Sequence, residues 1–365
     1  MQFIDIQAQY QAYKEAIDQR MRQVIDHGRF IMGPEVAEIE QTLANYVGVQ
    51  HCITTASGTD SLEIALRALE IGAGDEVITV PFTWISTAEV IAQVGATPVF
   101  VDIEASTYNI DVDQLESAIT PKTKAIMPVS LFGQMPDLGR INAIAEKHGI
   151  PVIEDAAQSF GATQHGRRSC SISSIASTSF FPAKPFGCFG DGGALFTNDD
   201  ELAEKMKTVR NHGGKMRHHH TMVGMNGRFD TLQAAVLLGK FPSFEKEVAT
   251  RNALGARYSE ALRNHCQIPA IHPGNTHVYA QYTIRSSNRD ELAAKLKESS
   301  VPTAVYYPKC LHEQPVFEPL GYTYGSFPVA EMASREVLSL PMHPFLSEGD
   351  QDKVVASVIE ASESI

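Results

Sequence analysis

Short apolar runs alternate with amphipathic helical patterns between about residues 50 and 200, and this alternation most constrains the fold. The first run is followed by a helical pattern whose apolar residues have the i, i+3, i+4, i+7 spacing of one buried face: Leu62, Ala65, Leu66 and Leu69. Strand-like runs lie at His51–Thr55, Glu76–Val80, Pro98–Asp102, Ala125–Val129 and Val152–Glu154. Repeated βα units predict an α/β fold with a largely parallel sheet covered by helices on both faces. Ligands of such sheets bind beyond the carboxyl ends of the strands, so functional residues are expected there.

The chain has 365 residues, which is enough for two packed domains. Near Pro242 a long helical pattern begins and the βα alternation ends. The later pattern predicts strands at Val278–Ile284, Thr303–Tyr307 and Val337–Leu340. It predicts a helix at Asp290–Lys297, between the first two of these strands. We therefore predict a large domain over residues 1–243 and a smaller C-terminal α+β domain over residues 244–365.

The composition excludes several classes of protein. A net charge of −13 disfavours nucleic acid or an anionic membrane as the main partner. The sequence has no run of 18 apolar residues, and its polar, helix-like beginning does not resemble a signal peptide. The five cysteines are scattered without a CxxC pair, as is typical of reduced thiols. We expect a cytoplasmic protein.

A basic stretch from Lys207 to Phe229 interrupts this acidic background, because it contains no aspartate or glutamate. Its basic side chains are Lys207, Arg210, Lys215, Arg217 and Arg228, with His212, His218, His219 and His220. A phosphate-bearing small molecule suits such a stretch, and a solvated basic loop explains the charge equally well. The three consecutive histidines are one metal candidate, but histidine-rich loops are often simply solvated, and we predict no metal.

Two segments at strand ends suit an aromatic phosphate ester. Ala56–Ser61 connects a strand to a helix, where Gly58 permits a tight turn and free N–H groups bind a phosphate. Ordinary helix capping explains the same residues. Pro81–Trp84 follows the next strand and contains the only tryptophan. An indole ring stacks well on an aromatic cofactor, although a lone tryptophan more often belongs to a core.

A third segment, Val152–Ser159, is an apolar strand that ends in Glu154 and Asp155, with Gln158 three residues further on. A carboxylate at the end of a buried strand needs a cationic partner or a metal to offset its desolvation. The protonated nitrogen of a pyridine ring is such a partner. A metal ligand or a ribose ligand is the alternative, and no neighbouring acidic or histidine pattern supports the metal.

The most informative segment is Ser179–Gly187, in which Lys184 lies between two prolines, within an aromatic run and before the glycine-rich Gly190–Gly193. Apolar surroundings lower the pKa of an ammonium group and favour a nucleophilic amine, as Schiff-base chemistry requires. A lysine that snorkels at a loop edge is the alternative. Together with the aromatic and phosphate-binding segments, this lysine favours an enzyme that uses pyridoxal 5'-phosphate (PLP).

The motifs GTDSL, PFTW, EDAAQSFGA, SFFPAKPFGCFGDGGALFTND and NGRFDTLQAA follow one another in this order. In this, the chain resembles the sugar aminotransferases related to the DegT/DnrJ/EryC1 group, from Gly33-Pro34 to Leu340–Pro344. The resemblance implies a type I PLP aminotransferase fold and a homodimer with shared active sites. It is closest to enzymes that aminate carbon 3 of a UDP-linked 3-keto-N-acetylglucosaminuronate for surface-polysaccharide (O-antigen) synthesis. A 4-keto-6-deoxy nucleotide sugar as substrate, or a non-catalytic regulatory role, is the alternative.

The resemblance also assigns roles to single residues. It implies that Lys184 binds PLP covalently, that Asp155 pairs with the pyridine nitrogen, that Gln158 contacts the phenolic oxygen and that Trp84 stacks on the ring. The implied phosphate ligands are Gly58, Thr59 and Ser179, with Asn226 of the second subunit. The implied substrate contacts are His212, Arg228, Tyr306 and Tyr307, and the implied amino donor is glutamate. Related dehydratases carry histidine in place of the lysine, so Lys184 favours transamination.

Overall fold

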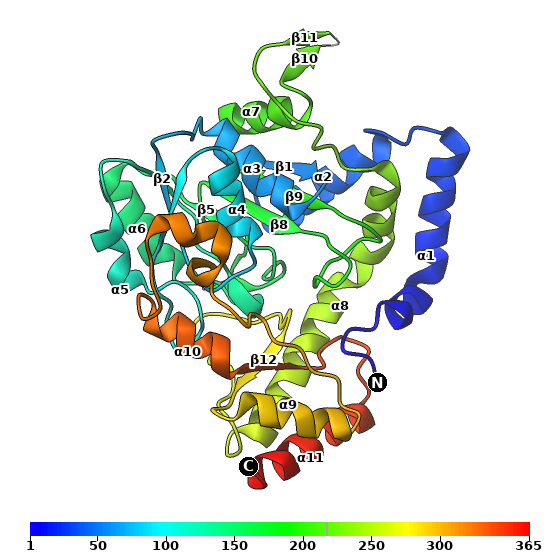
Figure 1. Ribbon diagram of the computed structural model, residues 1–365. Coiled ribbons are helices and arrows are strands. Elements are labelled where there is room, and N and C mark those ends of the chain that lie inside the picture. The colour runs from blue at the N-terminus through cyan, green and yellow to red at the C-terminus, as the bar shows by residue number, and fades with distance from the viewer. Residues whose placement is uncertain (217) are drawn as a thin grey trace.

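The computed structural model describes residues 1–216 and 218–365, so that Arg217 of the basic stretch lies outside the described residues. A central sheet is surrounded by helices, and a smaller group of C-terminal elements lies below it in Figure 1. The amino terminus lies beside these C-terminal elements. Within the described residues, no helix combines the length and the apolar character needed to cross a bilayer.

The central sheet has the strand order β3-β2-β4-β5-β8-β9-β1, since parallel bridges from Ile126 to Val152 and from Val129 to Asp155 join its two parts. Only β9 runs antiparallel to its neighbours among these described strands. The strands are β1 (His51–Thr55), β2 (Glu76–Thr79), β3 (Thr97–Phe100), β4 (Thr123–Ile126), β5 (Ile153–Asp155), β8 (Ile175–Ser179) and β9 (Gly193–Thr197). The predicted α/β fold with a largely parallel sheet is confirmed.

Helices cover this sheet as the apolar periodicity predicts. In the helix after β1, Leu62, Ala65 and Leu66 are buried. The helices of this part are α1 (Ile6–His27), α2 (Pro34–Val47), α3 (Gly58–Ala68), α4 (Ser86–Gln93), α5 (Val112–Leu115), α6 (Leu138–His148) and α7 (Asp200–Arg210). Two short hairpins complete this part: β6 (Thr163–Gln164) with β7 (Arg167–Arg168), and β10 (Gly214–Met216) with β11 (His219–His220). The second hairpin projects from the body in Figure 1.

The long helix α8 (Thr231–Leu262) runs from the central sheet to the C-terminal elements (Figure 1). The prediction that a helix begins near Pro242 was wrong, because Pro242 lies inside α8. The first part of α8 is buried on all sides, as the consecutive buried residues Ala234–Lys240 show. Such a segment lacks the 3.6-residue alternation by which an amphipathic helix is recognised. The domain division at residue 243 falls within this helix and stays a prediction.

The C-terminal elements combine β12 (Tyr282–Arg285) and β13 (Val337–Leu340), which pair antiparallel, with α9 (Arg289–Glu298), α10 (Pro328–Glu336) and α11 (Glu348–Glu363). The strand predicted to begin at Val278 begins only at Tyr282, because Val278 N–H donates to Gly133 O, between β4 and α6, instead of to a neighbouring strand. The strand predicted over Thr303–Tyr307 was wrong. Only a single bridge, from Ala304 to Ser339, forms there.

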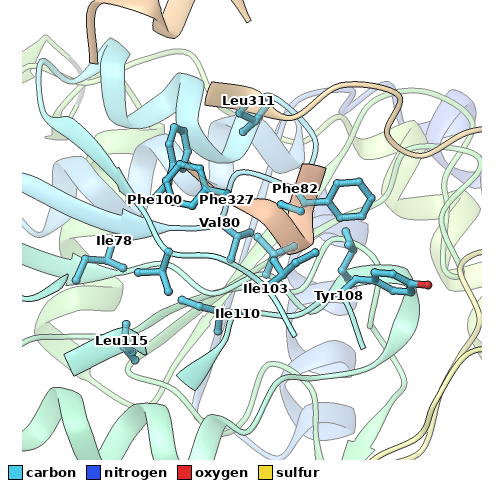
Figure 2. Close-up of a cluster of buried hydrophobic side chains, with 14 of the residues drawn as sticks. Ile78, Val80, Phe82, Phe100, Ile103, Tyr108, Ile110, Leu115, Leu311 and Phe327 are labelled. Carbon is cyan, nitrogen blue, oxygen red and sulfur yellow. The ribbon is translucent and has the colours of Figure 1, made fainter. Parts of the chain in front are cut away.

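A buried cluster joins the C-terminal half to the sheet and thereby fixes the loop after β2. Figure 2 shows Val80 and Phe82 from this loop near Phe327 and Leu311 of the C-terminal half. The backbone agrees with this packing, since Leu311 N–H donates to Pro81 O over 2.7 Å. The segment that carries Trp84 is therefore held from both halves of the chain.

Candidate active site

The carboxyl ends of β1, β5 and β8 and the loop after β2 surround one cavity of about 410 Å³. Because these strands run in the same direction, the residues that follow them meet at one edge of the sheet. The structure brings together at this cavity the predicted residues Gly58, Thr59, Trp84, Asp155, Gln158, Ser179, Lys184, Tyr306 and Tyr307.

Three predicted residues do not line this cavity. Asn226 is exposed and pairs with Asn211 through a β-bridge, and Arg228 Nη1 donates to Asn211 Oδ1 over 3.1 Å. His212 is exposed as well, at the base of the β10–β11 hairpin that projects from the body in Figure 1. The roles assigned to these side chains therefore stay predictions.

Lys184 lies in the loop after β8, where its N–H donates to Phe181 O over 2.8 Å. Its side chain is partly buried, and within the described part of the chain its amine has no hydrogen bond to another side chain or to the backbone. Burial lowers the pKa of Lys184, and the charge of Asp155 opposes this effect. Gly187 closes the loop tightly, because a Cβ there would lie 2.6 Å from the carbonyl oxygens of Phe181 and Pro182. The loop thus presents to the cavity an amine whose pKa is lowered by burial, which favours a nucleophile.

Asp155 is the last residue of β5, and only 5% of its surface is exposed. Its Oδ2 accepts a hydrogen bond from Thr87 Oγ1 over 2.8 Å, and its Oδ1 accepts one from Ala157 N–H over 3.2 Å. Burial raises the pKa of Asp155, whereas these two hydrogen bonds and the charge of Lys184 lower it. Among the described residues no lysine, arginine or histidine forms an ion pair with this carboxylate. A buried carboxylate without a cationic side chain as partner is suited to a cationic ligand atom.

The start of α3 gives the cavity a place suited to an anion. Helix α3 begins at Gly58, with Ser57 as its N-cap, so the N–H groups of its first turn point toward the cavity edge. Glycine is required because a Cβ at position 58 would lie 2.7 Å from Cβ of Ser179. Thr59 Oγ1 and Ser86 Oγ are 2.8 Å apart, which fixes the threonine on the same side. Backbone donors and hydroxyl groups therefore converge on one position.

Aromatic side chains also line the cavity. Gln158 Nε2 donates to the hydroxyl of Tyr307 over 3.0 Å, and Gln158 Oε1 accepts from Phe132 N–H over 2.8 Å. Burial raises the pKa of Tyr307, so its hydroxyl stays protonated. The ring of Trp84 lies 6.2 Å from that of Tyr307 between centroids, and 58% of Trp84 is exposed. One indole face is thus free to stack on a flat ligand.

Several residues of the site are absent from the sequence-based prediction. Thr83 and Ser86 line the cavity, and Thr87 binds Asp155. Their only signal in the sequence is a cluster of hydroxyl side chains around Trp84. Ile4 also lines the cavity, because the amino-terminal segment passes beside Tyr306, whose ring lies 6.3 Å from that of Phe3. Nothing in the sequence near Ile4 indicates this position.

Residues 11–359 match the DegT/DnrJ/EryC1/StrS aminotransferase family. The chain belongs to this family. It is 52% identical, over 95% of its own length and 96% of the relative's, to the UDP-2-acetamido-2-deoxy-3-oxo-D-glucuronate aminotransferase of Pseudomonas aeruginosa. The crystal structure of DesV from S. venezuelae in complex with a ketimine intermediate has a TM-score of 0.98 at 37% identity, and covers 100% of this chain and 99% of that one.

A third relative reveals the cofactor. The crystal structure of NtdA from Bacillus subtilis with bound cofactor PMP (pyridoxamine phosphate) has a TM-score of 0.91 at 32% identity, over 96% of this chain and 82% of that one. This member of the DegT/DnrJ/EryC1/StrS family is accordingly a PLP-dependent nucleotide-sugar aminotransferase.

The cavity fits this cofactor. A buried carboxylate, a helix terminus suited to an anion and an amine of lowered pKa line this one cavity, and they match the pyridine nitrogen, the phosphate and the aldehyde of the cofactor. Over residues 1–216 and 218–365, no three histidine, cysteine, aspartate or glutamate side chains gather as a metal site requires.

Proposed function

We propose that this enzyme transfers an amino group from L-glutamate to UDP-2-acetamido-2-deoxy-3-oxo-glucuronate in the synthesis of a bacterial surface polysaccharide. The observation that carries the proposal is one cavity in which the amine of Lys184 and the buried carboxylate of Asp155 lie with an anion-binding helix end. The identity of 52% to the P. aeruginosa relative of that name supports the choice of sugar.

The residues divide the chemistry among them. The cofactor, when bound, supplies an electron sink for the carbanion that forms at the substrate carbon. Lys184 holds the cofactor covalently, and its released amine removes the proton from the α-carbon of the donor amino acid. Asp155 keeps a proton on the pyridine nitrogen, because its charge stabilises the cationic ring.

The remaining contacts bind and orient. In our assignment Gln158 donates to the phenolic oxygen, and Trp84 stacks on one face of the ring, which excludes water from that face. The first turn of α3 and the hydroxyl of Ser179 would hold the phosphate of the cofactor. Tyr306 and Tyr307 form the wall nearest the sugar.

We further propose a homodimer in which Asn226, His212 and Arg228 serve the active site of the partner subunit. All three lie outside the cavity of their own chain. The same segment exposes apolar side chains, with Met216 68% and Val223 82% exposed, as is expected of a surface that a second chain covers. In a two-fold dimer each chain then completes the site of the other.

Mixing two inactive variants tests the shared site. A chain with Lys184→Ala and a chain with a bulky or acidic change at Asn226 each lack activity alone. In a mixed dimer one site contains both substitutions and the other contains neither. Free exchange of equal amounts makes about half of the dimers mixed, so about a quarter of all sites are expected to be intact. Activity after verified subunit exchange is the measurement. No recovery would show that Asn226 serves its own chain's site or none.

A substrate panel tests the choice of sugar. The PMP-loaded enzyme is mixed with a 3-keto uronate linked to UDP or with a 4-keto-6-deoxy nucleotide sugar, and the return of PLP absorbance is followed. We expect a kcat/KM at least about 10-fold higher for the 3-keto uronate, since the basic stretch supplies partners for two phosphates and a carboxylate. A faster reaction with the 4-keto sugar contradicts the proposed substrate. Conversion of bound PLP to PMP on addition of glutamate is expected of an enzyme and not of a non-catalytic regulatory protein.

A further inference from the structure

A buried hydroxyl on α4 determines the position of the Asp155 carboxylate. Thr87, in the first turn of α4, is 1% exposed, and its Oγ1 lies 2.8 Å from Oδ2 of Asp155. An ionised carboxylate only accepts hydrogen bonds, so the hydroxyl hydrogen of Thr87 is used for this contact. Hydrogen bonds to an ionised group are shorter and stronger than those between neutral groups.

A second threonine completes a chain of hydroxyl groups. Thr83 Oγ1 lies 3.2 Å from Thr87 Oγ1 and is 3% exposed. Since Thr87 donates to the carboxylate, Thr83 donates to Thr87. The order of donation is therefore fixed from Thr83 through Thr87 to Asp155, and such a chain polarises in the direction that stabilises a negative charge.

The same short segment also touches the other two cofactor contacts. Ser86 holds Thr59 at the anion-binding end over 2.8 Å, and Trp84 offers its ring to the cavity. Residues 83–87 thus connect the phosphate end, the stacking face and the carboxylate through one turn of chain. The buried cluster beneath Phe82 fixes this turn (Figure 2).

We propose that Thr87 is a positioning residue of the reaction, whose hydroxyl fixes the Asp155 carboxylate and keeps it ionised opposite the pyridine nitrogen. The proposal rests on the assignment of Asp155 to that nitrogen. A purely structural threonine would stabilise the fold without distinguishing one ligand ring from another. The role of Thr87 therefore predicts a dependence on the ring nitrogen itself.

Binding of two ring systems to the isosteric variant Thr87→Val tests this role. Purified, cofactor-free protein is dialysed against PMP and against its 1-deaza analogue, in which C–H replaces the ring nitrogen. We expect the variant to bind PMP about 10- to 100-fold more weakly than the parent, the usual range for loss of a hydrogen bond to a charged group. The variant and the parent are expected to bind the analogue with the same affinity. Thr87→Ser, which keeps the hydroxyl, is expected to restore the affinity for PMP.

Two further variants serve as references. Thr79→Val removes another buried threonine hydroxyl, which donates to Met127 O over 2.9 Å, and it is expected to bind both ligands as the parent does. Asp155→Asn is expected to lose affinity for PMP but not for the analogue. In the Asp155→Asn background, Thr87→Val is expected to add nothing, because the group through which it acts is gone. Thermal melting checks that each variant is folded, and Thr87→Ala replaces the valine variant if the latter unfolds.

The outcomes separate cleanly. Unchanged affinity for PMP in Thr87→Val, or equal losses for PMP and the analogue, overturns the role of Thr87. Equal losses for both ligands in Asp155→Asn overturn the assignment of Asp155 and the present proposal with it. The assay contains no sugar, so an error in the proposed substrate leaves these results unchanged.

Discussion

Replacing Lys184 by alanine is expected to lower the rate of amino transfer by at least about 10³-fold, because one change removes both the covalent attachment and the general base. The effect appears already in the half-reaction with glutamate, which is followed by the conversion of PLP to PMP. Lys205→Ala is a suitable control, since Lys205 forms only a surface ion pair with Glu70. A Lys184→Ala variant with more than a tenth of the parent rate would contradict the assignment.

Chemical labelling sharpens this test, because burial lowers the pKa of another lysine, Lys240, as well. Lys240 is 3% exposed, and burial lowers its pKa to about 8. Its amine donates to Gly187 O and does not line the cavity. Borohydride reduction of the loaded enzyme is therefore expected to attach the cofactor to the peptide containing Lys184 alone. Label on Lys240 would show that a low pKa, and not position, selects the attachment site.

Asp155→Asn is expected to retain bound PLP but to lower turnover by about 100-fold or more, the loss typical when a charge that stabilises a transition state is removed. The substitution preserves size but removes the negative charge that holds the pyridinium proton. The phosphate contacts and the covalent bond keep the cofactor in place. Absorbance of the bound cofactor and single-turnover rates with glutamate measure the two effects separately.

The control for this variant is Asp113→Asn, at an exposed carboxylate that pairs with Arg140 on the surface. It is expected to leave the rate unchanged. A near-normal rate in Asp155→Asn would mean that Asp155 is not the partner of the ring.

The residues that line the cavity at the strand ends could be grouped from the sequence for a physical reason. Parallel strands end at one edge of a sheet, so side chains that follow different strands meet without any knowledge of distances. Asp155 ends β5 and Lys184 follows β8, and these two strands are adjacent and parallel. The structure brings both residues to one cavity. The change from strand to helix at Gly58 could also be predicted from the neighbouring residues alone. The close approach of Ser179 to Gly58 could not, because it depends on the folded chain.

Other parts of the molecule depend on packing that no local pattern reveals. The start of α8 is buried all round and therefore carries no amphipathic signal. Thr303–Tyr307 has strand-like composition, yet its two tyrosines line the cavity, where Gln158 Nε2 donates to the hydroxyl of Tyr307. Thr87 resembles any residue in a first helical turn. Its contact with Asp155, 68 positions away, exists only in the folded chain.

The location of Trp84 makes its fluorescence an intrinsic probe of the cavity. The chain has a single tryptophan, and that residue lies at the rim of the cofactor cavity with 58% of its surface exposed. All indole fluorescence therefore originates at the cavity to which we assign the cofactor. We expect the near-ultraviolet absorption of a bound cofactor to overlap this emission and to quench it by energy transfer. Binding of the cofactor is expected to lower the fluorescence intensity of Trp84, and removal of the cofactor is expected to restore it. The measurement needs no attached dye. A ligand that shields Trp84 from water also shifts the emission to shorter wavelength, so that occupancy and polarity are read from one spectrum.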